Sequence, residues 1–106
     1  MSNFTYNSPY GSYENCYLIV SRYVDGGSPA IDIFNNEVGP IARVTVNIDS
    51  PLSPGEVAIK DYSENAGMLQ EMMRIGLVKS VLRYESSGFV KIPVCSYDEE
   101  VLKKYS

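Results

Sequence analysis

Apolar and polar side chains alternate most clearly in the stretch IARVTVNI, residues 41–48. Its apolar positions are Ala42, Val44, Val46 and Ile48, and its polar positions are Arg43, Thr45 and Asn47. Alternation with a period of two is typical of a strand that has one buried and one solvated face. We therefore predict a strand here, with Thr45 on the solvated face.

Two apolar runs precede this strand. Residues 16–23 and 30–34 are rich in β-branched and aromatic side chains, and turn residues at 25–29 and 35–40 separate the three segments. Strands that follow one another through short turns are antiparallel neighbours. The three segments predict an antiparallel meander, and residues 57–61 predict a short fourth strand.

A central helix is predicted next. Ser63 is a candidate N-cap, because its hydroxyl can accept a hydrogen bond from the first turn. Apolar residues at helical spacing follow it, namely Ala66, Leu69, Met72 and Met73. Gly76 is well suited to end the helix, because glycine readily adopts a left-handed conformation. The methionines at 68, 72 and 73 are either core residues or an adaptable binding stripe.

The C-terminal third predicts a hairpin and a second helix. Residues 77–84 and 89–95 read as two strands, and Pro93 requires an edge position or a bulge because it lacks an N–H. Residues 96–99 have the capping-box pattern, with Ser96 as the N-cap and Val101 and Leu102 as apolar anchors.

These segments together predict an α+β fold. We expect one mainly antiparallel sheet of five to six strands, formed by the meander and the C-terminal hairpin. One central helix and a short C-terminal helix complete it. A chain of 106 residues is enough for one core but not for two. Residues 16–106 are accordingly predicted to form a single domain.

The first 15 residues are polar and rich in tyrosine, and we predict an extended arm. Such an arm cannot easily bury its rings in the main core, and exposed aromatic rings are suited to binding partners. The candidates are Tyr6, Tyr10 and Tyr13. Single-stranded nucleic acid also stacks on aromatic rings, but it needs a basic groove beside them. No lysine or arginine precedes Arg22, so a protein partner is favoured.

The charge of the chain is polarised. The net charge is −4. Nine acidic and three basic residues occur up to Met73, whereas six basic and four acidic residues occur from Arg74 onward. This balance disfavours direct nucleic-acid binding and allows an acidic surface to meet a basic partner. The acidic residues that we expect to face solvent and the partner are Asp32, Glu37 and Glu56.

The sequence lacks the residues on which most catalysis depends. There is no histidine, the usual acid–base residue near neutral pH, and there is no phosphate-binding glycine loop. Two cysteines, Cys16 and Cys95, are too few for the usual structural zinc site, and we interpret them as core residues rather than as a reactive or bridged pair. Asp61 and Glu64 flank the predicted helix start, where carboxylates usually serve the helix dipole. We predict a protein that is not an enzyme and has no cofactor or metal.

The expected location is the cytoplasm of a bacterial host cell. No apolar run approaches the length of a membrane span, and the first residues lack the basic and apolar regions of a signal peptide. We expect no contact with a membrane.

Several motifs carry a resemblance to a known family. They are AIKDYSENAGML at residues 58–69, GLV at 76–78 and SGFVKIPVC at 87–95, together with AIDI at 30–33 and ARVTVNI at 42–48. The chain resembles an uncharacterised domain family of small proteins from plasmids, conjugative elements and phages of Firmicutes. The match covers roughly residues 17–95. It departs from the family in the arm, in the charged tail and at Tyr62, where tryptophan is usual.

The resemblance implies a counter-defence role without assigning any catalytic residue. Some small proteins of this kind inhibit host defence, including anti-CRISPR inhibitors of RNA-guided nucleases. We therefore expect an inhibitor that binds a host defence effector, an RNA-guided nuclease being one candidate. Two alternatives remain: a small-molecule binder or sponge for a nucleotide signal, and an enzyme with carboxylate chemistry.

Overall fold

The computed structural model describes residues 2–24 and 28–106. They form seven strands, two α-helices and one 3₁₀ turn. In chain order these are β1 (Phe4–Ser8), β2 (Gly11–Arg22), β3 (Pro29–Asn35), β4 (Gly39–Arg43), β5 (Glu56–Ala58), η1 (Ser63–Asn65), α1 (Met68–Arg74), β6 (Val78–Ser87), β7 (Val90–Tyr97) and α2 (Glu99–Tyr105). The fold is α+β, as predicted. The turn predicted at 25–29 lies partly outside the described residues.

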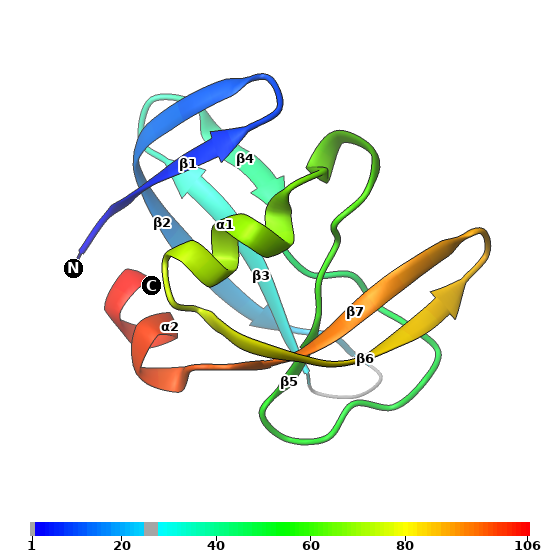
Figure 1. The fold of residues 1–106 in the computed structure, drawn as a ribbon. Coiled ribbons are helices and arrows are strands. Elements are labelled where there is room, and N and C mark those ends of the chain that lie inside the picture. The colour runs from blue at the N-terminus through cyan, green and yellow to red at the C-terminus, as the bar shows by residue number, and fades with distance from the viewer. Residues whose placement is uncertain (1, 25–27) are drawn as a thin grey trace.

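The strands form two antiparallel sheets rather than the single sheet that we expected. The first sheet has the order β1-β2-β3-β4, and the second has the order β5-β7-β6. The prediction of one sheet of five to six strands is therefore wrong. The meander and the hairpin do exist, but they belong to different sheets, which pack with the helices around one core (Figure 1).

The chain passes from the first sheet to the second within the alternating stretch 41–48. β4 ends at Arg43, the Val44 N–H then donates to the Ile31 carbonyl of β3 at 2.8 Å, and the Val46 N–H donates to the Ala58 carbonyl of β5 at 3.0 Å. Thr45 between them is buried, not solvated as predicted. Its Oγ1 accepts a hydrogen bond from the Ile31 N–H at 3.0 Å, which satisfies a buried backbone donor at the crossing.

The predicted arm is part of the first sheet. β1 pairs with β2 along its length, and Phe4 and Tyr6 lie in the core. The backbone N–H of Asn7 donates to the Glu71 carboxylate of α1 at 2.8 Å, which ties the strand to the helix. The prediction of an arm outside the core is therefore wrong for these residues. Ser8 pairs with Gly11, so residues 9 and 10 form the hairpin turn between the two strands.

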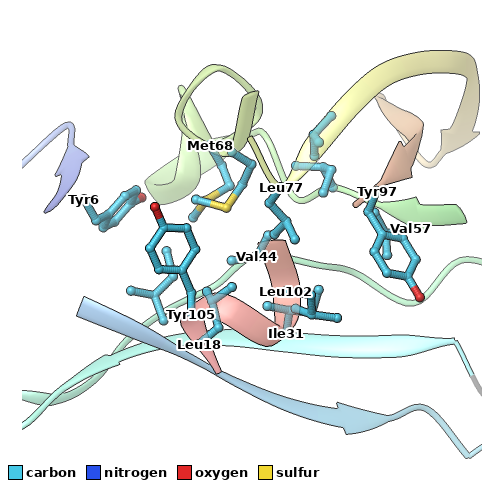
Figure 2. Packing of buried hydrophobic residues seen from close by; sticks show 14 of the residues in the cluster. Tyr6, Leu18, Ile31, Val44, Val57, Met68, Leu77, Tyr97, Leu102 and Tyr105 are labelled. Carbon is cyan, nitrogen blue, oxygen red and sulfur yellow. The ribbon is translucent and has the colours of Figure 1, made fainter. Parts of the chain in front are cut away.

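The core lies between the first sheet and a layer made of α1, α2 and the second sheet (Figure 2). Figure 2 shows Leu18 and Ile31 of the first sheet facing Met68 of α1. Met68 and Met72 are fully buried, which supports the core interpretation of these methionines, whereas Met73 is partly exposed. Cys16 and Cys95 are free and fully buried, as predicted. Burial raises the pKa of the Cys95 thiol to about 11, so this thiol is protonated at neutral pH.

The helix α1 starts later than predicted, and Ser63 does not cap it. Ser63 begins the 3₁₀ turn with a φ of +54°, outside the extended conformation of an N-cap. The Asp61 carboxylate takes the capping role instead, because its Oδ1 accepts hydrogen bonds from the N–H groups of Gly67 and Leu69, both at 3.0 Å. Gly76, with a φ of +85°, follows the last turn as predicted.

Asp61→Ala is expected to lower the free energy of unfolding by about 1–2 kcal/mol, because it leaves two N–H groups at the helix start without an acceptor. Ser63→Ala removes a side chain that makes no capping hydrogen bond and should change stability by less than about 0.5 kcal/mol. Urea unfolding monitored by circular dichroism measures both. Equal losses in the two variants would contradict the assignment of the cap to Asp61.

The predicted hairpin is confirmed as β6 and β7, but its turn is shorter. Ser87 pairs with Val90, so only Gly88 and Phe89 form the turn. Gly88 has a φ of +60° and Phe89 does not have a positive φ, which is the pattern of a type II′ turn. β6 therefore extends three residues further toward the tip than predicted, to Ser87, whereas β7 begins at Val90, one residue later than predicted.

Pro93 does not lie at an edge, because β7 is the central strand of the second sheet. The Pro93 carbonyl accepts from the Ile59 N–H at 3.0 Å, so this residue directs its polar groups toward the β5 side. Ile59 lies one residue beyond the end of β5, and Pro93 has no N–H with which to return this bond. The edge strands of this sheet are β5 and β6, and β6 carries two register irregularities opposite β7.

The C-terminal helix is confirmed, with a different cap. Ser96 belongs to β7, and the Asp98 side chain caps α2 by accepting from the N–H groups of Glu100 and Val101. Leu102 is buried, and the Tyr105 ring meets the Phe4 ring edge-on at 5.0 Å between centroids. The Ser2 N–H also donates to the Lys104 carbonyl, so the two ends of the chain lie side by side (Figure 1).

Candidate functional site

The three predicted tyrosines do not form one surface. Tyr6 is only 2% exposed, and its ring stacks against Tyr13 with 6.5 Å between centroids. Tyr13 is half-buried by this contact, whereas Tyr10 is 77% exposed at the turn between β1 and β2. Tyr6 is therefore a core residue, and the prediction that it binds a partner is wrong. Tyr10 and Tyr13 remain accessible to different degrees.

The three predicted acidic residues are also separate, and two of them are in ion pairs. Asp32 on β3 accepts two hydrogen bonds from Arg43 on β4, at 2.6 and 3.0 Å. Glu56 accepts from the Ser53 N–H and from Arg83, and these two bonds lower the pKa of its carboxyl. Glu37, at the turn between β3 and β4, is exposed and has no ion pair among the described residues.

An open hollow lies beside Glu37, between β2 and the β3–β4 turn. Its volume is about 1010 Å³. Its lining combines carboxylates, amides and aromatic rings, from Asn3, Ser12, Tyr13, Glu14, Asn15, Tyr17, Asn35, Asn36, Glu37 and Val38. Two of the predicted site residues, Tyr13 and Glu37, therefore meet here, although they are far apart in the sequence.

A bulge in β2 shapes one wall of the hollow. Phe4 faces Cys16 and Tyr6 faces Tyr13, so β2 has one extra residue in this interval. Asn15 accommodates the bulge with a φ of +55°, a left-handed conformation that asparagine tolerates better than most residues. The irregular backbone brings Glu14 and Asn15 to the hollow.

The opposite wall is held by a buried amide. The Asn35 side chain donates through Nδ2 to the Glu14 carbonyl at 3.4 Å and accepts through Oδ1 from the Val38 N–H at 2.7 Å. These bonds join the bulge to the β3–β4 turn. Beside them the Tyr17 ring stacks on Phe34, with 6.3 Å between centroids, and the Tyr17 O–H donates to Asn36. These hydrogen bonds and the ring contact therefore hold the walls of the hollow in place.

A second exposed region lies on the β6–β7 hairpin, which extends away from α1 and α2 in Figure 1. Leu82 and Tyr84 on β6 are 51% and 58% exposed, and Phe89 at the turn is fully exposed. The other face of the hairpin is engaged, because Glu85 accepts from the Ser50 hydroxyl and Arg83 pairs with Glu56. We call Leu82, Tyr84 and Phe89 the hairpin patch.

The sequence did not predict the hairpin patch, and it predicted only Tyr13 and Glu37 among the residues that line the hollow. The alternation of Leu82 and Tyr84 was visible in the sequence, as was Phe89 directly after a turn glycine. The sequence predicted a strand at residues 77–84, but it did not indicate that Leu82 and Tyr84 lie outside the core. Glu14 and the four asparagines gave no motif, because their proximity depends on the bulge and the pairing of β2 with β3.

The described part of the chain contains neither a metal-binding cluster nor a membrane-spanning helix. Residues 2–24 and 28–106 contain no group of three or more His, Cys, Asp or Glu side chains arranged to hold a metal ion. Within the same residues, neither helix has the length and apolar composition needed to span a bilayer.

Comparisons with models of known protein families, with curated proteins and with solved structures gave no match for this chain.

Proposed function

We propose that this chain is a non-enzymatic protein of a mobile genetic element that inhibits a host defence effector by binding to it. The leading candidate for the effector is an RNA-guided nuclease. The proposal joins the family resemblance of the sequence to one structural observation, the exposed hairpin patch. Large apolar side chains that protrude into solvent from one hairpin are typical of a protein-binding surface.

The hairpin patch is suited to act through its side chains. Phe89 and Tyr84 offer rigid aromatic area of the kind that dominates binding energy at interfaces. Strand addition at the β6 edge is disfavoured, because two register irregularities interrupt this strand. The partner therefore needs an apolar groove into which the tip of the hairpin inserts.

The net charge favours a basic partner. RNA-guided nucleases hold nucleic acid in positively charged channels. A chain with a net charge of −4 is attracted to such a channel at long range, whereas free nucleic acid repels it. The hairpin lies in the C-terminal part of the chain, which has six basic and four acidic residues, so the acidic residues up to Met73 are the ones that such a channel attracts.

The alternative of a nucleotide sponge has less support. A sponge for an anionic nucleotide needs cationic or backbone donors in a concave site. The hollow is spacious, at about 1010 Å³, yet its lining has two carboxylates and no lysine or arginine. Its chemistry therefore disfavours a phosphate-bearing ligand.

The test measures association and dissociation rates against purified RNA-guided nucleases, with and without guide RNA, at low and high salt. We expect faster association at low salt, since exposed charges steer the encounter and salt screens them. Binding should also be weaker once guide RNA or target DNA fills the channel.

Glu37→Lys is expected to slow association. It tests the charge alone, whereas Glu56→Lys would also break the ion pair with Arg83. Absence of binding to any defence effector, with tight binding of a nucleotide, would replace the inhibitor by the sponge.

A further inference from the structure

The two carboxylates of the hollow differ from most others in the chain. Carboxylates elsewhere are compensated by five ion pairs, namely Asp32–Arg43, Glu56–Arg83, Glu64–Lys60, Glu71–Arg74 and Glu85–Arg83. Asp61 and Asp98 bind the N–H groups at the starts of the two α-helices. By contrast, the side chains of Glu14 and Glu37 have no hydrogen-bond or ion-pair partner in the described residues, and both line the hollow. The hollow therefore has negative charge that the described residues do not neutralise.

The walls of the hollow supply further acceptors and aromatic surface. Asn3, Asn15 and Asn36 are among its lining residues, and an asparagine amide oxygen is a hydrogen-bond acceptor. Tyr13 and Tyr17 are also among the lining residues, and tyrosine faces attract cations. Carboxylates, amide oxygens and aromatic faces all favour a positively charged ligand with several hydrogen-bond donors.

Among biological cations, a guanidinium group fits this lining best. It is planar, always charged and carries five N–H donors in a fixed fork, and it stacks on aromatic rings. An ammonium group is more strongly hydrated and has three donors, so it gains less from the rings and loses more hydration. A volume of about 1010 Å³ exceeds what one side chain needs, so the hollow has room for the residues that flank it.

We infer that the hollow is a binding site for the guanidinium group of an arginine that a partner protein presents. The identity of the partner rests on the proposed function, but the chemistry of the hollow does not. Basic nucleic-acid channels are rich in such arginines. Arginine capture in the hollow would give the partner's contact with the first sheet a fixed orientation, which the apolar hairpin patch alone does not specify.

The experiment uses the full chain labelled with ¹⁵N and titrated with N-acetyl-arginine methylamide. We expect saturable shifts of the amide signals of residues 13–17 and 35–38, with a dissociation constant on the order of 1 mM for so small a ligand. The citrulline analogue has the same shape without the charge and should give no saturable shifts. The lysine analogue should bind more weakly.

Conservative variants connect the binding to the two carboxylates. Glu14→Gln and Glu37→Gln should each weaken binding about two- to five-fold, the range expected for one exposed charge contact. Asp49→Asn removes an exposed carboxylate outside the hollow and should leave the affinity unchanged. Unchanged amide spectra of the free variants establish that the fold is intact.

Three results would overturn the inference: equal binding of the citrulline analogue, shifts at other residues, or undiminished affinity in both glutamine variants. This failure is separable from that of the proposed function. If the chain binds a nuclease but not the arginine analogue, only the proposed arginine site in the hollow is wrong. If the chain binds the analogue but no defence effector, the arginine site is supported and the proposed function is wrong.

Discussion

Tyr6→Ala is expected to lower the free energy of unfolding by about 3–5 kcal/mol, the range typical of aromatic truncation in a core. Tyr6 is almost fully buried, its ring stacks on Tyr13, and its strand is tied to α1 through Asn7 and Glu71. The truncation would leave a cavity between the β1–β2 hairpin and the helix. A loss of this size is a large part of the 5–15 kcal/mol by which most domains are stable.

Tyr10→Ala is the matched control for this prediction. The same side chain is lost four residues later, but Tyr10 is 77% exposed at the turn, so stability should change by less than about 0.5 kcal/mol. Urea unfolding of both variants beside the unaltered chain measures the contrast. Similar small effects in the two variants would mean that the first residues are an arm after all and that β1 does not belong to the core.

The sequence predicted local elements better than it predicted their partners. The hairpin, both α-helices, the helix stop at Gly76 and the buried cysteines follow from patterns within a few residues, and the structure has all of them. The single sheet failed because alternation of side chains does not reveal where a strand changes its neighbour. Residues 44–46 alternate as regularly as those before them, yet they bond to β3 and β5 in turn.

Capping was another limit of sequence reasoning. A serine directly before a helical pattern is a good local signal, and it drew attention to Ser63. The structure instead inserts a 3₁₀ turn, and Asp61 reaches over it to the start of α1. At the second helix, Asp98 accepts the capping hydrogen bonds in place of the predicted Ser96. In both places a suitable carboxylate was two residues from the predicted cap, so residue type alone could not decide.

The candidate site was predicted only in part, for a related reason. The sequence identified Glu37 and Tyr13, and both line the hollow, but it grouped them with Tyr6, Asp32 and Glu56, which the fold uses in the core or in ion pairs. Whether a charged side chain is available to a partner depends on its neighbours in space. No pattern in the sequence distinguishes a free glutamate from one that faces an arginine across a sheet.

The largest effect on binding is expected from the hairpin patch. The double variant Tyr84→Ser, Phe89→Ser should weaken binding to the effector by about 30-fold or more, as removal of central aromatic anchors commonly costs at least 2 kcal/mol. The loss should appear mainly as faster dissociation, because these side chains make short-range contacts and carry no charge. Stability should change little, since both side chains are exposed in the free protein.

Tyr10→Ser separates a specific role of the hairpin from a general effect of exposed aromatic rings. Tyr10 is more exposed than Tyr84 but lies on the β1–β2 turn, in the other sheet. If the hairpin patch inserts into a groove of the effector, this control should bind within about two-fold of the unaltered chain, a change well below that of a binding anchor. A loss of affinity in Tyr10→Ser that equals the loss in the double variant would move the contact to the first sheet. The hollow and its two free carboxylates would then be the main binding surface rather than a second one.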